Sequence, residues 1–315
     1  MRVGVVDIGT NSTRLLIADA SADGQLTELD RRTQVTRLGD GVDASGSLAQ
    51  PAMERVFATL DRYREALDAA DVPAEARLAV LTSAVRDAAN GADFTAQVRD
   101  RYGLDARAIP GEREAQLTFL GATHDRDRDD RTRLLVFDIG GGSTELVVGH
   151  ADAVDFHVST QAGVVRQTER HIRHDPPRSE ELDEIASEIR AIIDAAVPAE
   201  IRSRAGAAIG VAGTATSLAA IDLALEPYDP VRVQGHVVSL ATAERTLTRL
   251  AALDLAARQK VPGLHPDRAP TIVAGMVILV EVLRAFGLQA TEVSEHDILH
   301  GVVLDCVSGR TRRKA

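Results

Sequence analysis

The chain contains the stretch Asp7-Ile8-Gly9-Thr10-Asn11-Ser12-Thr13-Arg14-Leu15-Leu16-Ile17, and a near-copy recurs as Asp138-Ile139-Gly140-Gly141-Gly142-Ser143-Thr144-Glu145-Leu146-Val147-Val148. Each stretch reads as an apolar strand ending in Asp, a turn of Gly, Ser and Thr residues, and a second apolar strand. Such a turn buries little and presents backbone N–H groups, hydroxyls and one carboxylate. These groups suit a phosphate held together with a divalent metal ion. The repeat therefore predicts two similar halves with an anion-binding cleft between them.

Composition narrows the classes of protein that fit. The 315 residues favour two domains, and a hydrophobic content of 44% is ample for their cores. A net charge of −11 and an aromatic content of 3% argue against nucleic acid as a partner. Only Lys260 and Lys314 are lysines, and neither follows a glycine-rich turn, which excludes a Walker-type loop. The single cysteine, Cys306, excludes an internal disulfide and a thiolate metal site.

No segment reads as a signal peptide or a membrane span. Val3–Ile8 already has the pattern of a strand, and the longest apolar stretch, 272–283, is short and contains Glu281. We therefore expect a cytoplasmic protein that does not bind membranes.

Hydrophobic periodicity places strands and helices in a similar order in both halves. The charged stretch 124–133 reads as a connector, so we predict an N-terminal domain over 1–127, a C-terminal domain over 128–309 and a basic mobile tail over 310–315. Predicted strands in the first half cover 3–8, 13–19, 26–36, 77–81 and 107–109; those in the second cover 134–138, 145–148, 153–159 and 207–211. The rest of the second half is predicted to be helical, with helices over 241–253, 268–286 and 297–307.

The two turns carry most of the candidate site residues. Asp7 and Asp138 each end an apolar strand, where a carboxylate is costly unless it meets a cation or hydrogen-bond donors, so we predict that both coordinate Mg²⁺. Glu145 is a third acidic candidate. Glycines let the backbone approach an oxyanion closely, and hydroxyl and amide groups add donors. The candidates of this kind are Asn11, Ser12, Thr13, Gly140, Gly141, Gly142 and Ser143.

Two arginines are candidates for binding phosphate. Arg14 follows the first turn directly, and Arg86 lies in the strand-to-helix segment Thr82-Ser83-Ala84-Val85-Arg86-Asp87-Ala88. The planar guanidinium group binds phosphate in bidentate fashion. A solvated surface position is the alternative for each of them.

Taken together, these motifs resemble the exopolyphosphatase/guanosine pentaphosphate phosphatase family. The resemblance runs from about residue 1 to residue 305 and includes the two turns, the segment 82–90, Gly111–Ala115 and the pair Gly213-Thr214. It implies an α/β fold of two ribonuclease-H-like (actin-like) domains, each a mixed sheet with flanking helices, and an active-site cleft between them. Longer family members add helical domains at the C-terminus, and this chain resembles the short two-domain form.

The resemblance also implies roles for single residues. Glu114 matches the catalytic glutamate that activates the attacking water, and Asp138 and Glu145 match acidic residues that arrange the metal and the water. Asn11, Arg86, Gly213, Thr214 and the glycines at 140–142 match phosphate-contacting positions. Mg²⁺, with Mn²⁺ as a substitute, and a homodimer follow from the same likeness. One stretch departs from the family pattern: Leu299 and His300 stand where members often carry an Arg-Glu pair.

Four functions remain open at this stage. The favoured one is removal of the terminal phosphate from inorganic polyphosphate, and the second is hydrolysis of guanosine pentaphosphate (pppGpp). An actin-like ATPase or sugar kinase would share the paired turns, although the Gly111–Ala115 motif is not typical of those enzymes. A sensor that binds nucleotide or polyphosphate without turnover is the non-enzymatic alternative.

Overall fold

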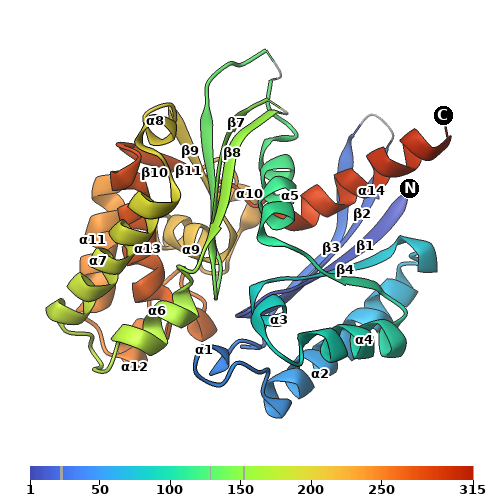
Figure 1. Cartoon of the computed structure of the whole chain (residues 1–315), viewed down its shortest axis with the longest axis horizontal. Helices are drawn as coiled ribbons and strands as arrows, with labels where there is room; N and C mark the ends of the chain where they lie inside the picture. Colours follow the sequence, from blue (N-terminus) through green and yellow to red (C-terminus); the bar gives the residue numbers. More distant parts are fainter. Residues whose placement is uncertain (22–23, 128, 152, 315) are drawn as a thin grey trace. The chain divides into compact units, whose positions relative to one another are not determined.

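The structure is a computed structural model that describes residues 1–21, 24–127, 129–151 and 153–314. The chain divides into two compact units, which are described separately. Unit 1 comprises Met1–His124 and Asp297–Ala315, and unit 2 comprises Asp125–His296. Each unit contains one sheet with helices packed against it (Figure 1).

Unit 1 is built on a five-stranded mixed sheet with the order β3-β2-β1-β4-β5. Strands β1, β2 and β3 form an antiparallel meander, while β1, β4 and β5 run parallel. Its elements are β1 (Arg2–Ile8), β2 (Ser12–Ala20), β3 (Leu26–Val35), α1 (Val42–Ser45), α2 (Gln50–Ala69), η1 (Ala74–Ala76), β4 (Arg77–Leu81), α3 (Ser83–Asp87), α4 (Gly91–Tyr102), β5 (Asp105–Ala108), α5 (Gly111–Thr123) and α14 (Ile298–Lys314).

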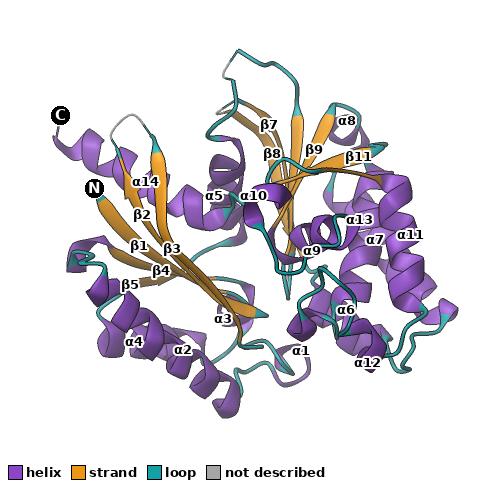
Figure 2. Ribbon diagram, turned by 180° about the vertical axis from the view of Figure 1, so that it is seen from behind, coloured by secondary structure: helices purple, strands orange, loops and turns teal. Residues whose placement is uncertain are grey.

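Both faces of this sheet are buried, because successive side chains of a strand point to opposite faces. One set of apolar side chains from β1 and β2, including Val6 and Leu15, packs with residues of α2 and α4. The alternate set, including Val5 and Leu16, packs with residues of α5 and α14. Figures 1 and 2 show these two helix pairs on opposite faces of the sheet. Because helices cover both faces of the sheet, β1 and β2 are continuous apolar runs and do not alternate between apolar and polar residues.

Unit 2 is built on a six-stranded mixed sheet with the order β10-β11-β9-β6-β7-β8. Its elements are β6 (Leu134–Ile139), β7 (Thr144–His150), β8 (Ala153–Thr160), α6 (Val164–His171), α7 (Ser179–Ala196), α8 (Ala199–Arg202), β9 (Ala207–Val211), α9 (Ala212–Asp222), α10 (Pro230–Val233), β10 (Val237–Ser239), α11 (Leu240–Ala251), α12 (Leu255–Arg258), η2 (Pro266–Arg268), α13 (Ile272–Ala285) and β11 (Ala290–Val293).

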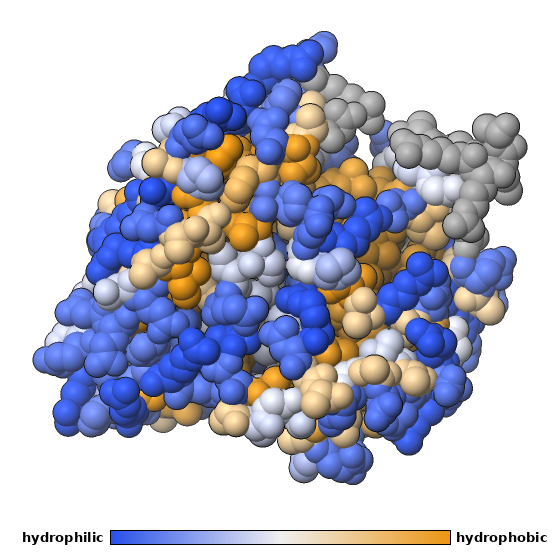
Figure 3. All heavy atoms as spheres, in the orientation of Figure 1, coloured by the Kyte–Doolittle hydropathy of each residue, from blue (hydrophilic) through white to orange (hydrophobic). Residues whose placement is uncertain are grey.

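The core of unit 2 lies between its sheet and helices α6, α7, α9, α11 and α13. Helix α13 is apolar almost all round, and residues Ile272–Leu283 are all buried within it. A helix with this pattern belongs inside a core. The more amphipathic α7 instead turns a mainly hydrophilic surface outward, as the space-filling view shows (Figure 3).

The two units repeat one topology, as the sequence predicted. In both, an antiparallel meander of three strands is extended by a parallel strand beside its first member: β4 pairs with β1, and β9 pairs with β6. The α/β class with two mixed sheets and flanking helices is thereby confirmed.

The position of the C-terminal helix corrects the predicted domain limits. Residues from Asp297 onward were assigned to the second domain, but they belong to unit 1. Helix α14 packs so closely on α5 that neither contact glycine has room for a side chain. A Cβ at Gly121 would lie 1.9 Å from the Asp297 carbonyl oxygen, and a Cβ at Gly301 would lie 1.8 Å from the Leu117 carbonyl oxygen. The predicted basic tail also continues this helix through Lys314, and Ala315 lies outside the described residues.

The prediction that the end of the second half is wholly helical was wrong. β10 and β11 add two short strands to the edge of the second sheet, with β11 parallel to β9 and β10 antiparallel to β11. These strands contain three and four residues, too few for an alternating pattern to stand out in the sequence.

Candidate functional site

The turn between β1 and β2 is closed by one hydrogen bond, from the Gly9 N–H to the Ser12 carbonyl at 2.9 Å. A Cβ at Gly9 would lie 3.1 Å from the Ser12 oxygen, so a glycine suits this tight approach. The carbonyls inside the turn are held by the segment that follows β3. Gly39 donates its N–H to Thr10, and Thr36 and Arg37 both donate to Asn11, at 2.8 to 3.0 Å.

These contacts orient the amide groups of the first turn. The C=O and N–H of a trans peptide point in opposite directions. Since the Thr10 and Asn11 carbonyls face the segment 36–39, the N–H groups of Asn11 and Ser12 point away from it. The first turn therefore presents two neighbouring donors on one side.

The turn between β6 and β7 repeats this construction. Gly140 donates its N–H to the Ser143 carbonyl at 2.9 Å, the same bond as in the first turn. Three successive carbonyls are then held by the start of α6. Val164 donates its N–H to Gly140 at 2.9 Å, and Val165 donates to Gly141 at 2.8 Å. The Nε of Arg166 donates to the carbonyl of Gly142 at 3.0 Å.

The second turn thus has three consecutive peptide groups fixed in one orientation. Because their carbonyls face α6, the N–H groups of Gly141, Gly142 and Ser143 point away from it. A run of N–H groups aligned in this way is an anion-binding arrangement. Gly141, Gly142 and Ser143 are all buried, so an anion bound here would be largely shielded from water.

Asp138 and Glu145 lie opposite each other on β6 and β7. Directly paired residues project from the same face of a sheet. Both carboxylates therefore lie beside the β6–β7 turn, residues 140–143, which is named the glycine turn. They are 7% and 1% exposed. Glu145 accepts a hydrogen bond from the Ser159 hydroxyl at 2.7 Å. Two buried carboxylates at one edge supply the hard oxygen ligands that Mg²⁺ prefers.

Asp7 and Arg14 occupy the equivalent pair of positions in unit 1. Arg14 donates to Asp7 Oδ2 from Nε at 2.9 Å and from Nη2 at 2.6 Å, and it also forms a short ion pair with Asp297. Burial raises the pKa of Asp7 above its ordinary value, against the opposing effect of Arg14. For Asp297, burial also acts to raise the pKa, but Arg14 and Arg31 outweigh it, so the pKa is lowered.

This network bears on two of the predicted roles. The contacts of Arg14 are directed at buried carboxylates, which favours a structural role for it in unit 1 over phosphate binding. Asp7 Oδ1 is buried and has no hydrogen-bond partner among the described residues. That oxygen is consistent with a ligand to a cation, and the role of Asp7 in binding metal stays a prediction.

Glu114 and Arg86 meet at the N-terminal turn of α5. The Nη1 of Arg86 donates to Glu114 Oε2 at 3.1 Å and to the Ile109 carbonyl at 3.2 Å. Glu114 is 7% exposed. Its helix is fixed by the close packing on α14 and by the ion pair between Arg113 and Asp305 at 2.6 Å. A buried carboxylate on a rigid element, hydrogen-bonded to an arginine, suits a general base.

Gly213 and Thr214 lie in the first turn of α9, directly after β9. The backbone enters this helix through Ala212, whose φ of 59° is a conformation that costs energy for an alanine. Arg268 donates to the Gly213 carbonyl at 2.9 Å and to the Ser217 hydroxyl at 3.1 Å. The predicted phosphate-facing role of Gly213 and Thr214 stays a prediction.

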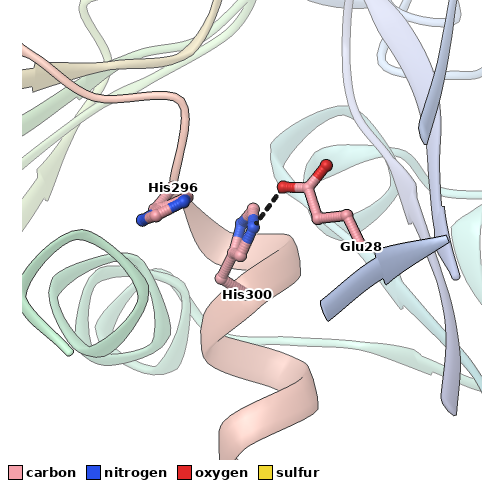
Figure 4. Close-up of side chains that lie close together, drawn as sticks. All are labelled: Glu28, His296 and His300. Carbon is pink, nitrogen blue, oxygen red and sulfur yellow. Dashed lines mark hydrogen bonds and ion pairs between the residues drawn. The ribbon is translucent and has the colours of Figure 1, made fainter. Parts of the chain in front are cut away.

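The stretch that departs from the family pattern is part of the scaffold of unit 1. Leu299 is fully buried among apolar residues of β1, β2 and α14. His300 is 1% exposed, and its Nε2 bonds to Glu28 Oε1 on β3 at 2.8 Å (Figure 4). Its position therefore links the start of α14 to the edge strand of the first sheet.

Sequence reasoning missed two contacts that shape the turns. Thr10 Oγ1 bonds to Ser83 Oγ at 2.8 Å and accepts the Ala84 N–H at 3.2 Å, which links the first turn to α3. Arg166 holds Gly142, as described above. Both contacts join residues distant in sequence, and no local pattern signals them.

Comparisons with known proteins agree with this geometry. Residues 16–309 match the Ppx/GppA phosphatase family. The chain is 36% identical to exopolyphosphatase 2 of Mycobacterium tuberculosis, across 96% of this chain and 98% of that protein. It is 27% identical to a guanosine-5'-triphosphate,3'-diphosphate pyrophosphatase of Photobacterium profundum, across 96% of this chain and 59% of that protein.

A solved structure extends the comparison to the fold. The crystal structure of an exopolyphosphatase from Cytophaga hutchinsonii superposes with a TM-score of 0.88 at 28% identity, covering 98% of each chain. Within the described part of the chain, no helix has the length and apolar character that a bilayer crossing requires.

Proposed function

Since this chain belongs to the Ppx/GppA phosphatase family, we propose that it is a Mg²⁺-dependent exopolyphosphatase, which hydrolyses the terminal phosphate of inorganic polyphosphate. The observation that carries the proposal is the glycine turn, in which the N–H groups of Gly141, Gly142 and Ser143 are fixed side by side. Donors fixed in advance stabilise the negative charge that spreads over the phosphoryl oxygens during transfer. The amides of Asn11 and Ser12 would bind phosphate in the same way.

Glu114 is the proposed general base. Its carboxylate would take a proton from the attacking water as the bond from water oxygen to phosphorus forms and the terminal phosphoanhydride bond breaks. The shortened polyphosphate leaves with the electrons of that bond. Arg86 holds one carboxylate oxygen at 3.1 Å and so orients the other. General-base catalysis of this kind contributes about 10²- to 10⁴-fold to the rate.

The acidic residues of the turns fit a divalent cation. Asp138 and Glu145 are buried cross-strand partners, and Asp7 has a buried oxygen without a hydrogen-bond partner among the described residues. We propose each of these carboxylates as a ligand for Mg²⁺, or for Mn²⁺ in its place. When bound, the ion would neutralise charge on the phosphate oxygens.

Hydrolysis of pppGpp is the second candidate, and the relative from Photobacterium profundum favours it. Both substrates end in a phosphoanhydride, so the turns and Glu114 would serve either one. The difference would lie in recognition of guanosine, for which the sequence offers few aromatic residues.

A phosphate-release assay with four substrate conditions tests the proposal. Polyphosphate, pppGpp, ATP and ATP with a sugar acceptor would each be supplied with Mg²⁺ or with a chelator. We expect phosphate release from polyphosphate with Mg²⁺ and none with the chelator. Faster release from pppGpp would favour the second candidate. Phosphorylation of the sugar would indicate a kinase, and binding without turnover would indicate a sensor.

Two finer expectations accompany the proposal. A homodimer would give a mass near twice 33.6 kDa in light scattering. A cytoplasmic location would be checked by fractionating the cells that produce the protein. The cleft predicted between the two halves likewise stays a prediction.

A further inference from the structure

Arg166 contacts the glycine turn in a way that no other side chain does among the described hydrogen bonds. It lies in the first turn of α6, and its Nε donates to the Gly142 carbonyl at 3.0 Å. The two preceding carbonyls, of Gly140 and Gly141, are held by backbone N–H groups of the same helix. The third peptide of the anion-binding run is therefore held by a side chain.

This difference matters because, among the described hydrogen bonds, no backbone N–H holds the Gly142 carbonyl, so the orientation of the Gly142–Ser143 peptide depends on a side chain. A glycine has a wide choice of backbone conformations, so rotation of this peptide meets little steric resistance from Gly142. If the peptide flipped, the N–H of Ser143 would turn away from the anion and the carbonyl oxygen of Gly142 would turn toward it. A donor would be replaced by a partial negative charge.

We propose that Arg166 is a positioning residue that locks the Gly142–Ser143 peptide with its N–H directed at the substrate phosphate. The inference rests on the proposed function, since it assumes that this turn binds the reacting phosphoryl group. Arg166 acts through the peptide, and the test must therefore separate its hydrogen bond from its charge. The lock matters most when charge develops on the phosphoryl oxygens, so its loss should lower kcat more than it raises KM.

Arg170 provides a matched control on the same helix. It lies one turn further along α6 and is engaged by Glu188 at 3.0 Å. Arg170→Ala removes the same charge from the same helix without touching the glycine turn. A long-range effect of charge would weaken both variants similarly, whereas a local lock would weaken only Arg166→Ala.

The experiment compares Arg166→Ala, Arg166→Lys and Arg170→Ala by steady-state phosphate release from polyphosphate with Mg²⁺. Loss of one oxyanion-type donor lowers kcat by about 10²- to 10³-fold, and we expect a decrease of that order for Arg166→Ala. The kcat of Arg170→Ala should stay within about twofold of that of the unmodified protein, because exposed ion pairs contribute little and Arg170 does not contact the glycine turn. Added guanidinium chloride at non-denaturing concentrations should restore part of the activity of Arg166→Ala and none in Arg170→Ala.

Orthovanadate binding by calorimetry gives a reading that does not require turnover. Affinity should fall at least about tenfold in Arg166→Ala and stay unchanged in Arg170→Ala. If Arg166→Ala does not fold, Arg166→Lys takes its place in the test. Its kcat should fall at least about tenfold, because lysine lacks the planar donor group of arginine. Equal kcat and equal vanadate affinity in the Arg166 variants and the unmodified protein would overturn the inference. Absence of polyphosphate hydrolysis by the unmodified protein would instead count against the proposed function, and the vanadate result would still decide the role of Arg166.

Discussion

Gly163→Ala should displace the glycine turn by a distance that the structure defines. Gly163 precedes α6, and a Cβ there would lie 2.2 Å from the Gly141 carbonyl oxygen and 2.3 Å from the Gly142 carbonyl carbon. Ordinary van der Waals contact begins at 3.4 Å, so the turn or the start of α6 must move by about 1.2 Å. Since the contacted atoms are backbone, no side-chain rotation can relieve the clash.

The expected cost to catalysis is comparable to the cost to stability, so the two must be measured separately. A displacement of about 1 Å can lower a rate by roughly 100-fold, which corresponds to about 2.7 kcal/mol in the activation barrier. Overpacking of this kind destabilises the fold by about 1–3 kcal/mol. Phosphate release would be measured well below the melting temperature of the variant, so that the loss reflects geometry and not unfolding.

Gly206→Ala is a suitable control for this variant. It lies in the same unit, and a Cβ there would meet its nearest atom at 3.4 Å, an ordinary contact. Its kcat should therefore match that of the unmodified protein. If Gly163→Ala keeps a kcat within threefold of this control, catalysis does not depend on the present position of the glycine turn, and the reasoning fails.

Three further predictions follow from single contacts. Glu114→Gln keeps the shape of the side chain but removes the base, so we expect it to bind polyphosphate normally and to lose about 10²- to 10⁴-fold in kcat; near-normal turnover would exclude Glu114 as the base. Arg14→Met leaves Asp7 and Asp297 as buried carboxylates without their shared arginine, and the free energy of unfolding in urea should fall by about 3–5 kcal/mol, a loss below 1 kcal/mol being the contrary result. Hydrogen bonds to Glu181 outweigh the effect of burial and lower its pKa from 4.5 to about 2, so its ionised form stabilises the fold above pH 4.5 and this contribution declines as the pH falls toward 2. The stability difference between the unmodified protein and Glu181→Gln should therefore shrink between pH 5 and pH 3, and a constant difference would contradict the assignment.

The parts of the site that could be predicted from the sequence are those set by local chain geometry. Each turn joins two adjacent strands, so its glycines and hydroxyl residues are neighbours in sequence as well as in space. The pairing of Asp138 with Glu145 follows from the turn length alone. The same register explains why Asp7 is opposite Arg14.

The parts that escaped prediction depend on contacts between distant segments. The sequence predicts that α14 is helical, but only the folded structure shows that its apolar side chains pack on β1, β2 and α5 of unit 1. The phosphate-binding role predicted for Arg14 depends on its place directly after the first turn, and it stays a prediction. The engagement of Arg14 by Asp297 depends on the same placement of the C-terminal segment.

Arg166 illustrates a third limit. Its side chain holds a carbonyl that lies 24 positions earlier in the chain, and nothing in the local pattern distinguishes it from other arginines of an amphipathic helix. The role of such a residue depends on which backbone atom it meets. That information is present only in the folded structure.

The most direct test of the central claim is to observe the amide groups of the glycine turn as phosphate binds. Amide NMR of the Glu114→Gln protein with ¹⁵N-labelled glycine would be recorded as a short polyphosphate is added in the presence of Mg²⁺. We predict that the Gly141 and Gly142 resonances shift together and saturably, whereas that of Gly206 stays unchanged. Saturable binding that leaves Gly141 and Gly142 unshifted would show that the substrate is held elsewhere.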